Sequence, residues 1–284
     1  MSKSNPQFKV NRQIASNLMS PAFLNGVAAP QIFQQAKELV DIWTAKYQAA
    51  QGRPFASELD ISIVSYVALR SIAFGPSASN ELRSYTEMLQ SPTASKQVHM
   101  DKEGGNQKDV PFPFPECPAV HQYHVTRKVE TFIARAQAFP FPRMVWHVLH
   151  LFGAVRKYLR IRDEHFDTAY AAARERVERA ADGRGQLSSG LDYMIHRAEL
   201  AAQRRDVQSV MSLPMMRDEM TGYVSVGHRT IAQAFRACLG HLSAHADTQV
   251  KLRAALHVAI PEAVGQGRLP TVTPDLPNSQ RSPI

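Results

Sequence analysis

The amino-acid sequence predicts an all-α protein built around one long central helix. The strongest signal is the stretch from 212 to 244, where Ser212 can cap a helix and Pro214 stands in the first turn, which tolerates a missing N–H group. Its apolar residues spread over more than one stripe, which indicates a helix buried on several sides. A second signal is the helical spacing of apolar residues in most other segments.

Composition limits the class of protein. With 284 residues and 44% hydrophobic content, the chain can bury a core and form one large domain or part of one. The net charge of +8 suggests acidic partners, but the basic residues are scattered among acidic ones, so we expect no nucleic-acid partner. Cys117 and Cys238 lie far apart in sequence, which argues against a disulfide framework and favours a reducing compartment.

Taken in order, the chain opens with a polar segment, 1–7, which we expect to be a cut end. Apolar residues then recur at helical spacing from Pro30 until Gly52 and Pro54 end the helix. A second helix should follow closely, capped by Ser57 with Asp60 in a capping-box arrangement and ending near Gly75.

The middle of the chain predicts a long surface loop, 76–118, with a short helical piece at 82–89. Helices are expected at 120–138 and 161–181, joined by an aromatic segment that contains Trp146. Apolar and basic residues beside each other here suit either a membrane surface or a solvated basic face over a packed Trp146. No stretch is long and apolar enough to predict a membrane span.

The remaining elements flank the central helix. Ser189 and Asp192 can cap a shorter helix before it, and Asp247 can cap a last helix with a regular apolar stripe after it. We therefore predict one helical domain over 1–268, followed by an extended or disordered proline-rich tail at 269–284.

The centre of the long helix is chemically unusual. Gly227 costs about 1 kcal/mol against alanine in a helix interior, and the Thr230 hydroxyl can bond back to a carbonyl one turn earlier, so the two together allow a local bulge. The alternative is a close helix–helix contact at Gly227 with a Thr230 hydroxyl satisfied by its own helix.

Five short runs stand in a distinctive order: MSPAFLN at 19–25, LDYMI at 191–195, RDEMTGY at 217–223, VGHRT at 226–230 and QVKLR at 249–253. In this order and spacing they resemble fungal members of the cytochrome P450 family. The third and fourth runs look like that family's long I helix, and the last looks like its J helix. The resemblance covers nearly the whole chain and implies an incomplete P450 helical fold, from about the C helix to the J helix.

The resemblance implies a haem cofactor, but the axial cysteine is missing. The family holds its iron through a cysteine thiolate in a loop that follows a Glu-x-x-Arg helix, and both come after the J helix. The sequence ends before either motif. Cys117 stands in the wrong part of the order and lacks the surrounding glycines, and Cys238 is most simply a core thiol.

The resemblance also assigns residues to the site. Arg12 keeps the spacing of the arginine that contacts a haem propionate, and Val226 and Gly227 match the I-helix positions beside the haem. Thr230 matches the threonine that helps deliver protons to oxygen, whereas Arg229 replaces the acid that precedes it. A guanidinium stays protonated, so it cannot relay a proton as a carboxyl group does.

By resemblance, the chain is part of a haem-thiolate monooxygenase that inserts oxygen into a small hydrophobic organic substrate. The implied partner is an NADPH-dependent reductase. The implied location is the cytoplasmic side of the endoplasmic reticulum membrane, and we expect no transmembrane anchor in this chain. We expect the chain, from a truncated gene model or a decayed gene, to be inactive alone. The alternative is a non-catalytic helical fragment that binds a hydrophobic ligand or a partner through its exposed apolar surface.

Two metal sites are weaker alternatives. His241 and His245 have the spacing of a zinc-protease helix, but Leu242 stands where the glutamate base is needed. Cys117, His121 and His124 could form a short cluster that lacks an evident fourth ligand. Surface histidines explain both sets more simply.

Overall fold

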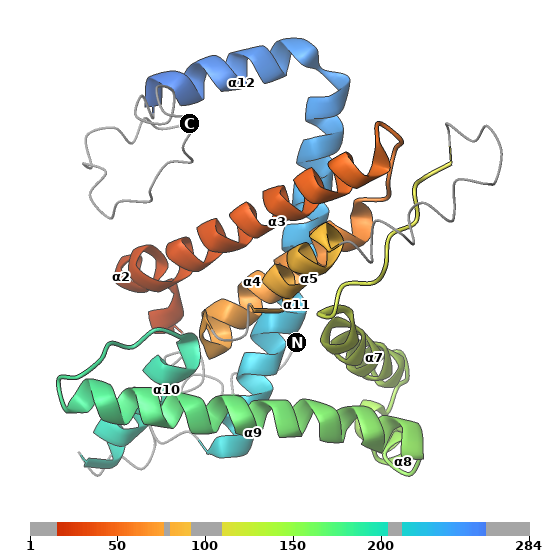
Figure 1. Ribbon diagram of the computed structural model, residues 1–284. Helices are drawn as coiled ribbons and strands as arrows, with labels where there is room; N and C mark the ends of the chain where they lie inside the picture. The colour runs from red at the N-terminus through yellow and green to blue at the C-terminus, as the bar shows by residue number, and fades with distance from the viewer. Residues whose placement is uncertain (1–15, 77–79, 92–109, 204–211, 260–284) are drawn as a thin grey trace.

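The computed structural model describes residues 16–76, 80–91, 110–203 and 212–259, and within these ranges the protein is all-α, without a strand (Figure 1). This confirms the predicted fold class. The helical elements run as follows: a short 3-10 turn (Ser16–Met19), α2 (Pro21–Phe23), a π-helical turn (Leu24–Ala28), α3 (Ala29–Ala50), α4 (Glu58–Phe74), α5 (Asn80–Gln90), α7 (Val120–Gln137), α8 (Pro142–Leu149), α9 (Gly153–Ala181), α10 (Gly190–Gln203), α11 (Leu213–Ala244) and α12 (Ala246–Ala259).

The long helix α11 begins at Leu213 as predicted and runs unbroken to Ala244. Its buried side chains occur every fourth position and therefore form one stripe. They are Met216, Met220, Val224, His228 and Ala232. The expectation of burial on several sides is wrong for the described residues, because Ile231 and Phe235 are exposed on the remaining surface.

The helix buried on all sides is α4. Thirteen of its residues are buried, among them Ile63, Val67 and Ala73, and it lies between α3, α5 and α11 in Figure 1. Its apolar content explains this position, since a helix that is hydrophobic all round must be covered by neighbours. The core of the described chain is thus centred on α4, with α11 packed along it.

The predicted capping box at the start of α4 is not formed. Ser57 makes no side-chain cap hydrogen bond. Asp60 instead faces α3, where both of its carboxylate oxygens accept hydrogen bonds from Lys46 Nζ at 2.8 Å and one accepts from Trp43 Nε1 at 3.1 Å. A long-range ion pair has displaced the local cap.

The start of α9 was also predicted wrongly. The helix begins at Gly153, eight residues before the expected Ile161, and the aromatic segment before it forms a helix of its own, α8. Trp146 of α8 packs against a small cluster made by Val129 of α7 with Val155 and Leu159 of α9. This packing supplies the stability that the sequence pattern did not reveal.

The predicted cap of α10 is confirmed. The Asp192 N–H donates to Ser189 Oγ at 3.2 Å, and the Asp192 carboxylate accepts from the Ser188 N–H at 2.9 Å. Arg176 of α9 completes the joint, because its guanidinium donates to the Asp192 carboxylate at 2.7 Å and to the Phe74 carbonyl at 2.9 Å. One arginine thereby links α9, α10 and the end of α4.

The last helix, α12, begins at Ala246, so Asp247 lies in its first turn and is not its cap. The helix lies beyond the end of α11 in Figure 1, and none of its residues is buried. The predicted apolar stripe therefore packs against nothing in the described part of the chain. The predicted tail at 269–284 and the site residue Arg12 lie outside the described residues, so the domain limits stay a prediction.

Candidate functional site

The predicted bulge in α11 is absent, and Gly227 is a close contact between helices. A methyl group built on Gly227 would lie 2.6 Å from Leu69 Cδ1 of α4, so only glycine fits at this crossing without a shift. The helix continues through 227–230 without a break. The structure therefore has the helix–helix alternative, with Leu69 packed directly against Gly227.

Thr230 is satisfied by its own helix, as that alternative predicts. Its hydroxyl donates to the Gly227 carbonyl at 2.9 Å and approaches the Val226 carbonyl at 3.4 Å. Val226 and Thr230 are one turn apart and both are exposed, Val226 to 70%. These two predicted site residues therefore share one uncovered face of α11, which points away from Leu69.

His228, between these positions, is 1% exposed and packs edge-on against Tyr66 and Tyr123, with ring centroids 5.7 Å apart in both pairs. Its Nδ1 lies 2.9 Å from the Val224 carbonyl, which accepts only, so the ring proton is assigned to Nδ1. Burial lowers the pKa of His228. The side chain is therefore a neutral core histidine.

Arg229 is 62% exposed and faces an acid on α7. Its guanidinium lies 3.8 Å from Glu130 Oε2, which is also 3.2 Å from Arg127. Glu130 Oε1 is buried and makes no hydrogen bond within the described residues. Glu130 is thus an ion-pair partner of Arg229 from a neighbouring helix.

The two cysteines lie in different surroundings. Cys117 is buried, and burial raises the pKa of its thiol to about 11, so it stays protonated at neutral pH. Cys238 is exposed on α11, so the expectation of a core thiol is wrong. The reason is the single buried stripe of α11, which excludes position 238.

The histidine pair of the zinc alternative, His241 and His245, has ring centroids 4.3 Å apart near the end of α11. Among the residues that the structure describes, no three His, Cys, Asp or Glu side chains lie close enough together to hold a metal ion. No described helix is long and apolar enough to cross a membrane.

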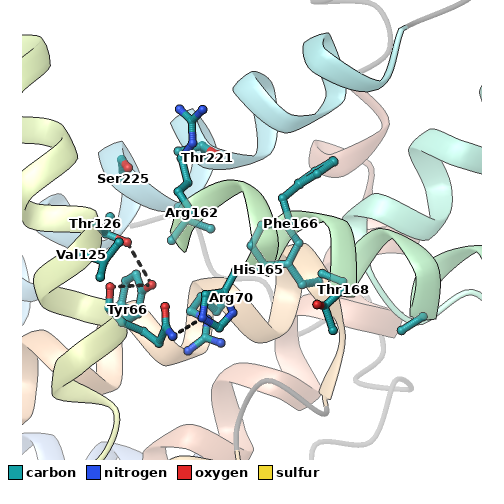
Figure 2. A pocket seen from close by; sticks show the side chains of 15 residues that line it. Tyr66, Arg70, Val125, Thr126, Arg162, His165, Phe166, Thr168, Thr221 and Ser225 are labelled. Atoms are coloured by element: carbon teal, nitrogen blue, oxygen red, sulfur yellow. Dashed lines mark hydrogen bonds between the residues drawn. The ribbon is translucent and has the colours of Figure 1, made fainter. Parts of the chain in front are cut away.

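A cavity of about 220 Å³ lies between α4, α7, α9 and α11, and the sequence did not predict it (Figure 2). Its wall contains Tyr66 and Thr126, whose hydroxyl oxygens are 3.0 Å apart, together with Arg70, Arg162 and His165. With Val224 of α11, the wall gathers residues from four helices without a shared motif. The only sequence signal was the presence of arginines and hydroxyl residues on otherwise apolar helix faces.

The described residues fit one wall of a haem site. For such a group the uncovered face of α11 presents the apolar Val226 and the Thr230 hydroxyl. It offers no thiolate, because Cys117 is a buried thiol with a raised pKa. Iron ligation would therefore need residues outside those described.

Comparison with known proteins gives a consistent result. The relatives are cytochrome P450 monooxygenases. The chain is 26% identical over 280 residues to TRI13 of Fusarium sporotrichioides, 25% identical over 257 residues to a protein of Pestalotiopsis microspora, and 24% identical over 276 residues to xilC of Penicillium rubens. These matches cover 89 to 95% of this chain and support its resemblance to fungal P450 proteins.

The chain spans less than half the length of these curated relatives, 43 to 46%. No protein-family model matches the chain, and no solved structure matches it.

Proposed function

We propose that this chain forms part of a haem-thiolate monooxygenase that inserts oxygen into a small hydrophobic organic substrate, and that it is inactive alone. The observation that carries the proposal is the uncovered face of α11, on which Val226 and Thr230 stand at the positions that the resemblance places beside haem. The similarity of nearly the whole chain to P450 monooxygenases supports it.

In this proposal each predicted site residue has a role. Val226 would contact the haem face, Gly227 would set the distance between α11 and α4, and Arg12, outside the described residues, would bind a propionate. When bound, haem supplies oxygen activation. The Thr230 hydroxyl is held by the Gly227 carbonyl and can accept a hydrogen bond from a ligand on the exposed side.

Arg229 is the residue that sets this chain apart from the family pattern. A guanidinium remains protonated at any working pH, so Arg229 can hold an anion but cannot pass a proton to Thr230. Its partner Glu130 carries a carboxylate but pairs with two arginines. We propose that this chain lacks the family's acid-assisted route for protons.

The proposed partners follow the family: a reductase that draws electrons from NADPH, at the cytoplasmic side of the endoplasmic reticulum. Peripheral membrane contact is supported by a group of exposed apolar side chains around α8, beside the basic residues of early α9. They are Phe139, Phe141, Met144, Val148, Leu151 and Phe152. Trp146 packs inward against the cluster of Val129, Val155 and Leu159. The segment therefore combines a packed Trp146 with an exposed apolar surface.

The test is a spectrum of the full chain, expressed with haem, reduced and exposed to carbon monoxide. We expect no thiolate-type spectrum, because Cys117 is a buried thiol with a raised pKa and Cys238 lies exposed on the long helix α11, not in a loop. A thiolate-type spectrum would overturn the proposed inactivity.

The second candidate function is a non-catalytic helical protein that binds a hydrophobic partner. It is favoured by the exposed Ile231 and Phe235 on the same helix as Val226. Sequencing of the transcript beyond Arg281 separates the two. An in-frame Glu-x-x-Arg helix and cysteine loop would support the enzyme, and an immediate stop codon would support the binding protein.

A further inference from the structure

The cavity between α4, α7, α9 and α11 is separate from the proposed haem face. Val224 and Ser225 line it, whereas Val226 and Thr230 are exposed. Successive residues of an α-helix are rotated by about 100°, so Val226 points about 200° away from Val224. The two sites therefore lie on opposite sides of α11, and what the cavity binds is independent of the proposed monooxygenase.

The charged side chains that line the cavity are arginines. Both Arg70 and Arg162 contribute to its wall, and no carboxylate does. Arg162 pairs with Asp163 at 2.7 Å, but Arg217 also pairs with Asp163, at 3.2 Å. One carboxylate therefore serves two guanidinium groups, and a positive charge is left uncompensated beside the cavity.

The second arginine of the wall, Arg70, has partners of its own. It pairs with Glu81 at 2.9 Å, and its guanidinium lies 5.5 Å from the ring centroid of Tyr66. Nearby His165 is neutral, because burial and, next, the charge of Arg70 lower its pKa. In Figure 2 Arg70 and His165 lie together on one side of the cavity, with Thr221 and Ser225 on the other.

Two hydroxyl groups of α11 face this cavity without internal partners. Thr168, on α9, donates its hydroxyl to the Glu164 carbonyl at 2.9 Å, as helical threonines commonly do. Thr221 and Ser225, one turn apart, make no such bond with any other residue that the structure describes. Figure 2 shows Arg162 extending from α9 on the same side as these hydroxyls.

Much of the remaining wall is apolar. Phe166, Val125 and Val224 are buried around the cavity, and Ala169 leaves space between them. A concave, mainly apolar space with a few polar groups in its wall is the usual form of a small-molecule site. The arginine side chains favour a ligand with a negatively charged group, and the apolar part of the wall favours a ligand whose remaining part is apolar.

We propose that this cavity binds a small organic acid. The carboxylate accepts hydrogen bonds from Arg162 and from the hydroxyls of Thr221 and Ser225, and a flat apolar body lies against Phe166 and Ala169. A guanidinium matches the two oxygens of a carboxylate better than a single ammonium group does.

The proposal is tested by calorimetric titration of the full chain with benzoate and with benzamide, which has the same shape but no charge. Saturable benzoate binding is expected, with benzamide at least about tenfold weaker, since a charge-assisted pair contributes about one factor of ten or more. Arg162→Gln should weaken benzoate binding by about tenfold. Arg160→Gln is the matched control, because Arg160 is on the same helix but exposed, and it should leave the affinity unchanged.

A second variant makes the test independent of charge. Ala169→Phe should fill the cavity and abolish benzoate binding, and circular dichroism with thermal melting will report whether each variant is folded. Absence of saturable benzoate binding to the unmodified chain would overturn the proposal. So would equal affinity for benzamide, or benzoate binding that survives both Arg162→Gln and Ala169→Phe.

Discussion

At the residue scale, Gly227 illustrates how the packing of two helices can require one residue type. Alanine is preferred over glycine in a helix by about 1 kcal/mol, whereas overpacking a core contact costs about 1 to 3 kcal/mol. Because the new methyl group would meet buried Leu69, we expect the cost of overpacking to exceed the gain in helix propensity.

Gly227→Ala should therefore lower the free energy of unfolding by about 1 kcal/mol, measured by urea denaturation. In a Leu69→Ala background the clash is gone, and the same change should be neutral or stabilising. Gly222→Ala is the control, since nothing lies within 4 Å of a methyl group there, and it should stabilise the protein. Equal effects of Gly227→Ala in both backgrounds would refute the contact.

His228 should make stability depend on pH. Burial lowers its pKa in the folded state, so the unfolded state binds the proton more readily. The stabilisation is fully present above the unfolded pKa of about 6.5 and is lost as the pH falls through the folded pKa. A single group contributes at most about 1.4 kcal/mol per pH unit.

The measurement compares urea unfolding of the natural chain and His228→Phe at pH 7.5 and pH 5.5. Phenylalanine keeps the edge-on contacts with Tyr66 and Tyr123 but does not titrate. We expect the natural chain to lose more stability on acidification than the variant. If both proteins lose the same free energy of unfolding between pH 7.5 and pH 5.5, His228 is not responsible for the pH dependence.

At the scale of elements, the joint of α9, α10 and α4 depends on one ion pair. Asp192 is 0% exposed and accepts hydrogen bonds from Arg176, Ser188 and Ser189. Removing one partner of a buried pair leaves an uncompensated charge, which costs about 3 to 5 kcal/mol. Gly75 belongs to the same joint, because a methyl group there would lie 3.1 Å from the Arg176 guanidinium.

Arg176→Ala should therefore destabilise the protein by about 3 kcal/mol or more in urea unfolding. Arg174→Ala, two residues earlier on α9, removes exposed interactions with Glu178 and Tyr170 and should cost about 0.5 kcal/mol. If both substitutions cost the same, the joint does not hold the three helices together.

The same scale shows what the sequence could predict. The start of α11 and the cap of α10 are encoded within a few residues, by Pro214 and by the Ser189 and Asp192 pair, and both were found. The partner of Asp60 was missed because Lys46 lies on another helix. Local chemistry predicts caps, but an ion pair between helices needs the tertiary fold.

The candidate site, too, could be predicted from the sequence only in part. A short motif placed Val226, Gly227 and Thr230 on one helix, and the structure adds which of them faces outward. The cavity beyond Val224 could not be predicted, since its wall gathers residues from four helices that share no spacing. Periodicity identifies the face of a helix but not its neighbour.

At the scale of the whole molecule, the exposed apolar group around α8 should govern attachment to lipid surfaces. Phe141 and Leu151 are exposed just before and just after α8, and the Leu151 carbonyl accepts a hydrogen bond from Arg156 of α9 at 2.8 Å. Apolar side chains next to basic ones bind anionic interfaces through both burial and charge.

Sedimentation with anionic vesicles should show binding that weakens with added salt. The double change Phe141→Ser and Leu151→Ser should reduce it by about a hundredfold, since each apolar side chain contributes about 1.5 kcal/mol or more when buried and about 1.4 kcal/mol corresponds to a factor of ten. Val258→Ser, at an 83% exposed position of α12, should have little effect. Loss of binding in the Val258 variant alone would place the lipid contact elsewhere.

The burial of α4 beneath α11 also has a consequence during protein synthesis. Ser62 on α4 accepts a hydrogen bond from Arg236 on α11, 174 residues later in the chain. At about 5 to 20 residues per second, a ribosome needs roughly ten to thirty-five seconds to make that distance. Throughout this interval the most apolar helix of the nascent polypeptide lacks its largest cover, so chaperone supply should govern the yield of folded product.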